Sequence, residues 1–433
     1  MELSVRQRGF LEVLSQTAHL PAEKLQAYQR ELLGPLVRHA AANVPFYRDR
    51  LRSVLTDDGT LDFSRWHTIP PFDRKAAQAA GDTLQTEKLP VGNNRWVEDL
   101  TAGSAGVPLR HRRSNLTDLA SRCQSERDYN WYGMDTGKCL AHIGDIRNVK
   151  ADPPEGMKLN SWSLRGDGDF IALDLRTNIE QQILWLQRTR PRYFFAYPSV
   201  LRDLADYVLS SGQLALWFGV VLTTGEPLSQ DVRTKTQRAF GARIYDRYNV
   251  HELGHLAAEC PSCGQYHLSA ESALVEILRD DGEPVGPGEI GRVVVTSFYN
   301  YAMPFIRYDV GDFAEVGWSN VCWRTLPSLR RILGRDRNVF VTPDGSRVWP
   351  DLQAIDLGRF MGFRQFQIVQ TTPKEIEIRY VPDSSERAPD EAGLQEHLRA
   401  VLYSGLRLRT IPLDAIPRLP SGKHEDFLSL VSA

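Results

Sequence analysis

The chain has 433 residues, which is long for one compact core, so we expect two unequal domains. Its 52 Lys and Arg residues nearly balance 54 Asp and Glu residues. Such a balance provides no basic field that would gather nucleic acid or anionic lipid. Any anionic ligand must therefore be bound by a local site.

The sequence does not resemble that of a membrane or secreted protein. Its longest apolar runs, such as Gly219–Leu222, are far too short to span a bilayer, and the polar start Met1–Arg8 does not resemble a signal peptide. Five cysteines are an odd number, which argues against a disulfide framework. We therefore expect a cytoplasmic protein with neither nucleic acid nor membrane as partner.

The amino-terminal part of the chain reads as helical over residues 1–90. Apolar residues recur at helical spacing from Val5 to Val37, and the following Asn43-Val44-Pro45-Phe46-Tyr47 contains a proline that should end the helix. From about residue 95, β-rich runs alternate with helical stretches, which is typical of a layered α/β domain. These runs are Cys139–Ile143, Tyr193–Tyr197, Trp217–Thr223 and Ala242–Tyr245.

A second β-rich stretch predicts hairpins rather than crossover units. Two strand-like runs, Ala273–Leu278 and Arg292–Thr296, flank the turn Asp280–Pro284. After Arg335 the pattern restarts with strand, helix and strand, so we place a domain boundary near Asp336–Asn338. The predicted fold is α/β, with a large multi-layered α/β amino-terminal domain (1–335) that includes a β-rich subdomain, and a small mobile α+β domain (336–433).

The stretch Thr101–Pro108 combines glycines with small and hydroxyl residues. Gly103 and Gly106 let backbone N–H groups close around phosphate oxygens, and Thr101 and Ser104 add hydroxyl donors. A simple hairpin turn is the alternative, because the stretch is neither a dinucleotide fingerprint nor a Walker loop.

The run Cys260-Pro261-Ser262-Cys263-Gly264 has the spacing of a zinc knuckle. Two further ligands are needed, and either His255 or His267 could supply one of them. We favour His255 because it lies just before the knuckle. Unpaired thiols or a redox pair are the alternatives, although no thioredoxin-like strand and helix surround the cysteines. With four protein ligands the zinc would be structural.

Read together, the motifs resemble adenylate-forming enzymes, in particular the phenylacetate–coenzyme A ligase-like branch. The resemblance is carried nearly end to end by successive motifs in the expected order. These are Asn43–Tyr47, Thr68–Arg74, Thr101–Arg110, Ala196–Leu201, Thr224–Leu228, Tyr248–Gly254, Arg307–Asp312, Gly334–Asn338 and Arg418–Lys423. The resemblance implies ATP and Mg²⁺ as cofactors and an acyl-adenylate as intermediate.

The resemblance also implies roles for individual residues. Glu252 would bind magnesium, since carboxylates suit this hard cation, and Lys423 would stabilise the reacting carboxylate and α-phosphate. The implied nucleotide contacts are the loop residues Thr101, Gly103, Ser104 and Gly106, the adenine neighbours Gly225, Glu226 and Tyr248, the ribose-binding Asp312, and Arg335 at the hinge between domains. Cys322 aligns with a second cysteine knuckle of some relatives, with Asn320 in place of its partner cysteine.

Several positions depart from the pattern of the family. Asn249 and His251 stand where glycine and threonine are usual, Ala102 and Ala105 replace loop hydroxyls, and Arg337 and Asn338 replace part of an acidic hinge pair. Because hinge rotation serves the second reaction step, the hinge departure affects that step most.

The sequence therefore predicts an AMP-forming acid–thiol ligase that activates a carboxylic acid and passes it to coenzyme A. Transfer to a carrier-protein thiol or to an amine is the nearest alternative. A catalytically decayed nucleotide-binding or zinc-bearing interaction module is the alternative from another class. A second copy of the chain is a candidate partner, and the sequence does not identify the acid.

Overall fold

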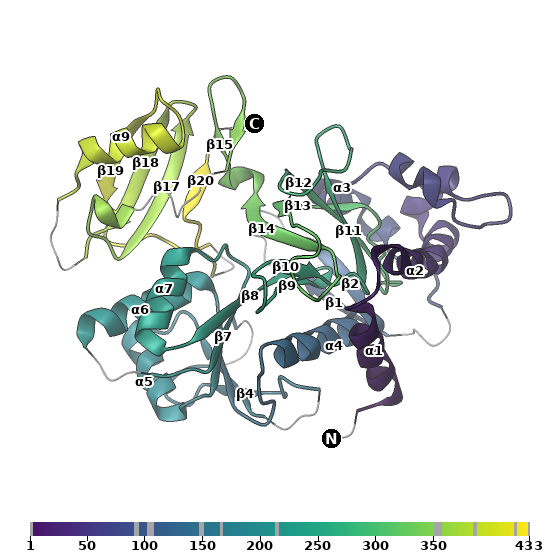
Figure 1. Cartoon of the computed structure of the whole chain (residues 1–433), viewed down its shortest axis with the longest axis horizontal. Coiled ribbons are helices and arrows are strands. Elements are labelled where there is room, and N and C mark those ends of the chain that lie inside the picture. Colours follow the sequence, from purple (N-terminus) through teal and green to yellow (C-terminus); the bar gives the residue numbers. More distant parts are fainter. Residues whose placement is uncertain are drawn as a thin grey trace. The chain divides into compact units, whose positions relative to one another are not determined.

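The structure is a computed structural model that describes residues 3–90, 95–101, 108–146, 151–164, 168–212, 216–349, 357–383, 388–419 and 422–431. The chain divides into two compact units (Figure 1). The first unit comprises Met1–Leu140, Leu159–Phe170 and Tyr245–Ile332, and the second comprises Ala141–Lys158, Ile171–Ile244 and Leu333–Ala433. No described helix is both long and apolar enough to cross a membrane.

The first unit begins with helices, as the sequence predicted. Helix α1 (Val5–Thr17) starts at a capping box in which Ser4 and Gln7 exchange hydrogen bonds. The helix α2 (Ala22–Asn43) ends directly before Val44 and Pro45, which confirms the predicted stop. Shorter elements follow: η1 (Pro45–Tyr47), η2 (Arg52–Val54), η3 (Phe63–Thr68), α3 (Arg74–Ala80), η4 (Gly81–Leu84) and later α4 (Asn115–Trp131).

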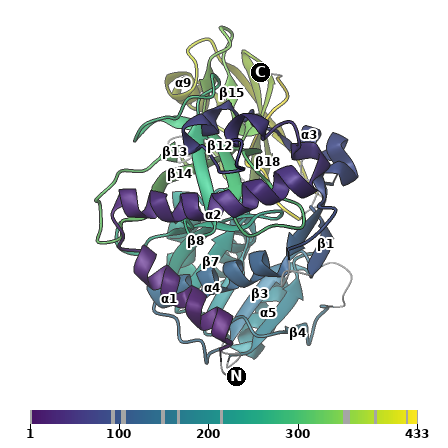
Figure 2. The ribbon, with the colours of Figure 1, turned by 90° about the vertical axis from the view of Figure 1, so that its right-hand side faces the viewer.

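The sheet of the first unit has the strand order β11-β12-β13-β14-β10-β9-β8. The predicted hairpin is confirmed, since β11 and β12 pair antiparallel across the turn after Leu278. Helix α2 crosses one face of this sheet (Figure 2), and the two share an apolar core. The strands are β8 (Arg243–Val250), β9 (Gly254–Glu259), β10 (Tyr266–Leu268), β11 (Ala273–Leu278), β12 (Ile290–Ser297), β13 (Tyr308–Val316) and β14 (Ser328–Arg335), with a separate hairpin of β1 (Trp96–Leu100) and β2 (Arg110–Ser114).

The second unit contains the crossover part of the fold. Its strands follow the order β7-β6-β3-β5-β4, and the parallel pair β6–β7 is joined by a helix, as parallel pairing requires. Side chains of α5, α6 and α7 pack with these strands in one core. The elements are β3 (Leu140–Gly144), β4 (Met157–Leu159), β5 (Phe170–Asp174), α5 (Ile179–Thr189), β6 (Tyr193–Ala196), α6 (Pro198–Ser211), β7 (Val220–Thr224) and α7 (Gln230–Phe240).

The carboxyl-terminal residues of the second unit form a four-stranded sheet in the order β19-β18-β17-β20 with a core of its own. The helix α9 contributes Leu394 and Leu398 to that core. The predicted α/β class is thereby confirmed. The elements here are η5 (Asp336–Asn338), β15 (Phe340–Val341), β16 (Arg347–Val348), η6 (Leu357–Arg359), β17 (Gln365–Thr372), β18 (Glu375–Val381), α9 (Glu391–Val401), β19 (Arg407–Pro412) and β20 (Phe427–Ser429).

A buried arginine joins the early segment around Pro70 to the sheet of the first unit. Arg307, 2% exposed, donates from Nη1 to the carbonyl oxygens of His67 at 2.8 Å and Ile69 at 2.6 Å. Its Nη2 lies 3.2 Å from Oε1 of Glu276 on β11. Burial raises the pKa of Glu276, and the guanidinium opposes that rise.

We expect Arg307→Met to destabilise the protein by about 3–5 kcal/mol, because the Glu276 carboxylate would stay buried without its cation. Thermal and urea unfolding followed by circular dichroism measure the loss. Arg52→Ala is the control, since the Arg52 side chain is 84% exposed. Equal stability of the two variants would contradict this account.

Candidate active site and metal centre

The turn between β8 and β9 presents Glu252. Gly254 ends this turn with φ +86°, and a Cβ there would lie 2.3 Å from Oγ of Ser121, so only glycine fits. Glu252 is 5% exposed, and its Oε1 accepts a hydrogen bond from the Tyr308 hydroxyl at 2.9 Å. The carboxylate is therefore oriented by a buried side chain of β13.

Strands β8 and β13 bring together Tyr248 and Asp312, to which the family resemblance assigned contacts with adenine and ribose. The hydroxyl of Tyr248 donates to Oδ2 of Asp312 at 2.7 Å, although 64 residues separate them. Tyr248 is mostly buried and Asp312 is half-buried. Thus β8 and β13 bring together two predicted site residues within the first unit, and β13 also orients a third, Glu252.

Thr101 lies at the end of the β1–β2 hairpin. Its Oγ1 accepts from the backbone N–H of Leu109 at 2.9 Å and contacts the guanidinium of Arg74. The hydroxyl thus helps to close the hairpin from which the glycine-rich loop departs. The predicted contacts Gly103, Ser104 and Gly106, with Ala102 and Ala105, lie outside the described residues.

A histidine pair beside Glu252 was not singled out from the sequence. The rings of His111 and His251 lie 5.1 Å apart, and Nε2 of His251 lies 3.3 Å from Oδ2 of Asp99. Burial, followed by the nearby His251, lowers the pKa of His111 to about 4, so His111 is neutral at pH 7. No sequence signal revealed this pair, because His111 and His251 lie on separate elements.

The second unit brings Lys423 to the predicted adenine neighbours. Gly225 has φ +82°, and a Cβ there would meet Cε of Lys423 at 3.1 Å and Nζ at 3.2 Å. The carboxylate of Glu226 accepts from the backbone N–H groups of Ser199 and His424 at 2.8 and 2.6 Å. Ser421 of the same motif lies outside the described residues.

Arg335 ends β14 next to a tight turn. Its backbone N–H donates to Oδ1 of Asn338 at 3.0 Å, and Gly334 before it has φ +83°. Nδ2 of Asn338 donates to the carbonyl oxygen of Phe427 at 2.7 Å, and Arg337 pairs with Glu425 at 2.6 Å. The two departures from the family's hinge pattern thus both have partners near the carboxyl terminus.

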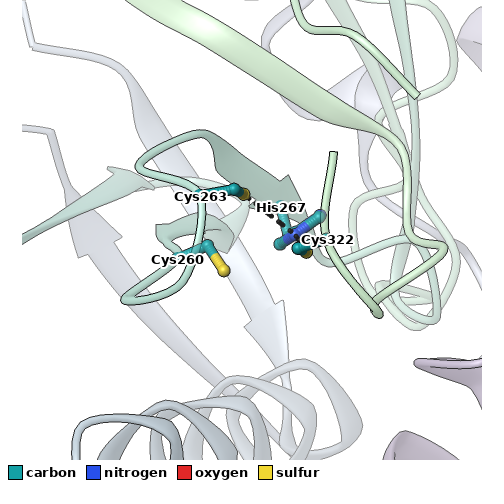
Figure 3. A group of neighbouring side chains, drawn as sticks. All are labelled: Cys260, Cys263, His267 and Cys322. Atoms are coloured by element: carbon teal, nitrogen blue, oxygen red, sulfur yellow. Dashed lines mark hydrogen bonds between the residues drawn. The ribbon is translucent and has the colours of Figure 1, made fainter. Parts of the chain in front are cut away.

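Four potential metal ligands gather between two loops of the first unit (Figure 3). Cys260 and Cys263 lie in the β9–β10 turn, His267 lies on β10, and Cys322 comes from the segment between β13 and β14. One ligand atom from each lies within 4.8 Å of all the others. Nε2 of His267 is 3.3 Å from the Cys322 sulfur and 3.8 Å from the Cys263 sulfur.

The preference for His255 as zinc ligand is corrected by this geometry. Nε2 of His255 forms a hydrogen bond with Oδ2 of Asp128 at 2.6 Å, and Nδ1 of His255 forms one with Oγ of Ser269 at 2.9 Å. Both ring nitrogens are therefore used elsewhere. The Nδ1 of His267 instead bonds to the carbonyl oxygen of Leu326 at 3.1 Å, which turns Nε2 toward the thiols.

The environment of the knuckle favours a thiolate at Cys260. Burial opposes ionisation, but hydrogen bonds from His267 and from two backbone amides, with the nearby Arg324, lower its pKa to about 6. Nη1 of Arg324 lies 3.0 Å from the Cys260 sulfur. Three sulfurs and one imidazole nitrogen are the donor set of a closed tetrahedral zinc site.

The chain is similar to known ligases over most of its length, whereas no protein-family model matches it. It is 26% identical over 352 residues to the phenylacetate–coenzyme A ligase of Thermus thermophilus, covering 76% of this chain and 74% of that relative. It is 23% identical over 356 residues to the ligase of the same name from Escherichia coli, with coverage of 78% and 77%.

The solved structures show the same fold. A 2-hydroxyisobutyryl-CoA ligase in the postadenylation state matches with a TM-score of 0.76 at 18% identity, over 96% of this chain and 91% of that one. The Bacillus subtilis O-succinylbenzoate coenzyme A synthetase in complex with AMP matches with a TM-score of 0.53 at 16% identity, over 75% and 67%. The predicted resemblance to adenylate-forming enzymes of the phenylacetate–coenzyme A ligase-like branch, which are AMP-forming acid–thiol ligases, is thus confirmed in sequence over about three quarters of the chain, and the fold agrees with it.

Proposed function

We propose that the chain joins a carboxylic acid to coenzyme A through an acyl-adenylate formed with ATP. In the first step a carboxylate oxygen attacks the α-phosphorus and pyrophosphate leaves. In the second step the thiol sulfur of coenzyme A attacks the acyl carbon and AMP leaves. The names of the relatives and the complexes of the solved neighbours with acyl-AMP and coenzyme A support this sequence of steps.

The observation that carries the proposal is the approach of Lys423 to Gly225 within the second unit. Both residues were assigned from separate motifs, one to the reacting phosphate and the other to the adenine. An ammonium group at this position neutralises the charge that develops on the carboxylate and phosphate oxygens during attack. The two positions lie close enough for both residues to act on one bound nucleotide.

The first unit offers groups for the remaining parts of the nucleotide. We assign magnesium binding to Glu252, whose buried carboxylate is the ligand type that Mg²⁺ prefers, with Tyr308 fixing its orientation. Bound magnesium would neutralise phosphate charge. Asp312 would accept the ribose hydroxyls and Tyr248 would stack on adenine, and the hydrogen bond between these two side chains holds them in register.

We expect Lys423→Ala to lower pyrophosphate exchange by about 100- to 1000-fold, because one electrostatic donor to the transition state is lost. Binding of ATP, measured by calorimetry, should be retained. The matched control is Lys374→Ala, which removes an exposed lysine from the turn between β17 and β18. Equal, measurable exchange in wild type and Lys423→Ala would contradict the role of Lys423, whereas wild-type protein that binds ATP without any exchange would favour the decayed nucleotide-binding module over a ligase.

The acid and the acceptor are identified by a screen of aromatic, aliphatic and amino acids for pyrophosphate release. Trapping with hydroxylamine detects the acyl-adenylate, and mass spectrometry detects acyl-coenzyme A. We expect one chemical class of acid to give both products. An acid that supports pyrophosphate exchange without acyl-coenzyme A would instead indicate a carrier-protein thiol or an amine as acceptor.

We further propose that Cys260, Cys263, His267 and Cys322 bind one structural zinc ion. Four protein ligands leave no open position for catalysis, so the ion would fix the turn between β9 and β10 to the segment before β14.

We expect about one zinc per chain in protein purified without added metal, as a closed four-ligand site binds the ion tightly. Cys260→Ser and His267→Ala should reduce the zinc content measured by plasma mass spectrometry and lower the melting temperature. Cys139→Ser, which removes a thiol outside this cluster, should leave both unchanged. Wild-type protein that is free of zinc yet equally stable after chelation would contradict the assignment.

A further inference from the structure

Contacts of Arg418, which precedes Lys423 in the chain, attach the segment around Lys423 to helix α6. We define the Lys423 loop as residues 418–419 and 422–426. Nη2 of Arg418 lies 2.7 Å from Oδ2 of Asp203, and its Nη1 donates to Oγ of Ser199 at 2.5 Å. Asp203 and Ser199 lie one helical turn apart, so a single guanidinium bridges two points of α6.

The side that follows Lys423 is fastened as well. Nη1 of Arg202 donates to Oδ1 of Asp426 at 2.8 Å, and the backbone N–H of His424 donates to Oε1 of Glu226 at 2.6 Å. Glu226 also accepts from the backbone and the hydroxyl of Ser199 at the first turn of α6. Charged groups of α6 thus hold the Lys423 loop on both sides of the lysine.

These contacts are buried enough to matter energetically. The side chain of Arg202 is 4% exposed and that of Asp426 is 21% exposed. Burial alone would raise the pKa of Asp426, but Arg202 and His424 hold it well below its usual range, so the pair is charged at neutral pH. Loss of one partner would leave the other charge buried without compensation.

The loop itself is closed by short-range hydrogen bonds. The backbone N–H of Leu419 donates to the carbonyl oxygen of Lys423 at 2.9 Å, and that of Gly422 donates to Leu419 at 2.7 Å. Gly422 has φ +76°, and a Cβ there would meet the Leu175 side chain at 2.6 Å. A movement at either fastening point is therefore transmitted to the backbone that carries the lysine.

We propose that Arg418 with Asp203, and Arg202 with Asp426, are positioning residues that hold the Lys423 ammonium for the adenylation step. The inference rests on the proposed function of Lys423. None of the four side chains needs to touch the substrate. They act on the reaction through the placement of one cation, and misplacement by about 1 Å can cost about 100-fold in rate.

The proposal predicts a defect confined to the first half-reaction. Arg418→Ala should lower pyrophosphate exchange by about 10- to 100-fold with the acid chosen by the screen above. Formation of acyl-coenzyme A from supplied acyl-adenylate should change by less than about 3-fold, because no phosphate attack occurs in that step. Arg418→Lys should recover part of the exchange, since one ammonium can reach Asp203 but cannot bridge Ser199 as well.

A double-mutant comparison separates positioning from a direct role. In the Lys423→Ala background, Arg418→Ala should lower exchange by less than about 2-fold further, because there is no longer an ammonium group to place. An additive loss would overturn the proposal, as would an equal loss in both half-reactions. Wild-type protein without pyrophosphate exchange would refute the proposed function instead.

A measurement without substrate tests the fastening directly. Hydrogen–deuterium exchange of peptides covering residues 422–431 should be about 10-fold faster in Arg202→Met and Arg418→Ala than in wild type. The control is Arg238→Ala, which removes an exposed arginine from the last turn of α7 in the same unit. Unchanged exchange in the first two variants, with the melting temperature preserved, would overturn the proposal.

Discussion

The structure depends on one constraint, which is that a buried charge must meet a partner. Asp128 on α4 is fully buried, and its Oδ2 lies 2.6 Å from Nε2 of His255 and 3.5 Å from Nε of Arg247. Burial would raise the pKa of Asp128, yet His255 and the two adjacent arginines lower it. The helix α4 is thereby held to the strands β8 and β9, which lead into the turn of Glu252.

The same constraint organises the groups proposed to bind the nucleotide in the first unit. Glu252 accepts a hydrogen bond from the Tyr308 hydroxyl of β13, and Asp312 accepts one from the Tyr248 hydroxyl of β8, so both carboxylates are oriented before any ligand arrives. A site that is oriented in advance loses little free energy in ordering its side chains when charge develops. Strands β8 and β13 keep Tyr248 and Tyr308 in place because they pair with other strands of the sheet.

The departures from the family pattern are also accommodated by partners. Arg337 pairs with Glu425, and Asn338 bonds to the backbone of Phe427, directly after the Lys423 loop. His251 lies against His111 and near Asp99. These residues have specific contacts of their own, so each departure is accommodated within the fold.

Local signals in the sequence determined much of the fold. Pro45 fixed the end of α2, the turn before Pro284 fixed the β11–β12 hairpin, and alternating strands and helices fixed the α/β class. The sequence pattern did not separate the first helices. It ran from Val5 to Val37, whereas α1 and α2 are separate helices with a break before Ala22. These features depend on backbone geometry over a few residues, which the sequence specifies directly.

The sequence also named the residues of the proposed site, through motifs whose spacing is local. Only the tertiary structure decided which of them meet. His255 lies nearer to Cys260 along the chain than His267 does. Its ring nevertheless forms a hydrogen bond with Asp128 on a distant helix, and His267 faces the thiols instead. Likewise, α6 and the Lys423 loop are joined by ion pairs between residues more than 200 positions apart. Such pairing is decided by long-range packing and by the desolvation of charge, which no local pattern encodes.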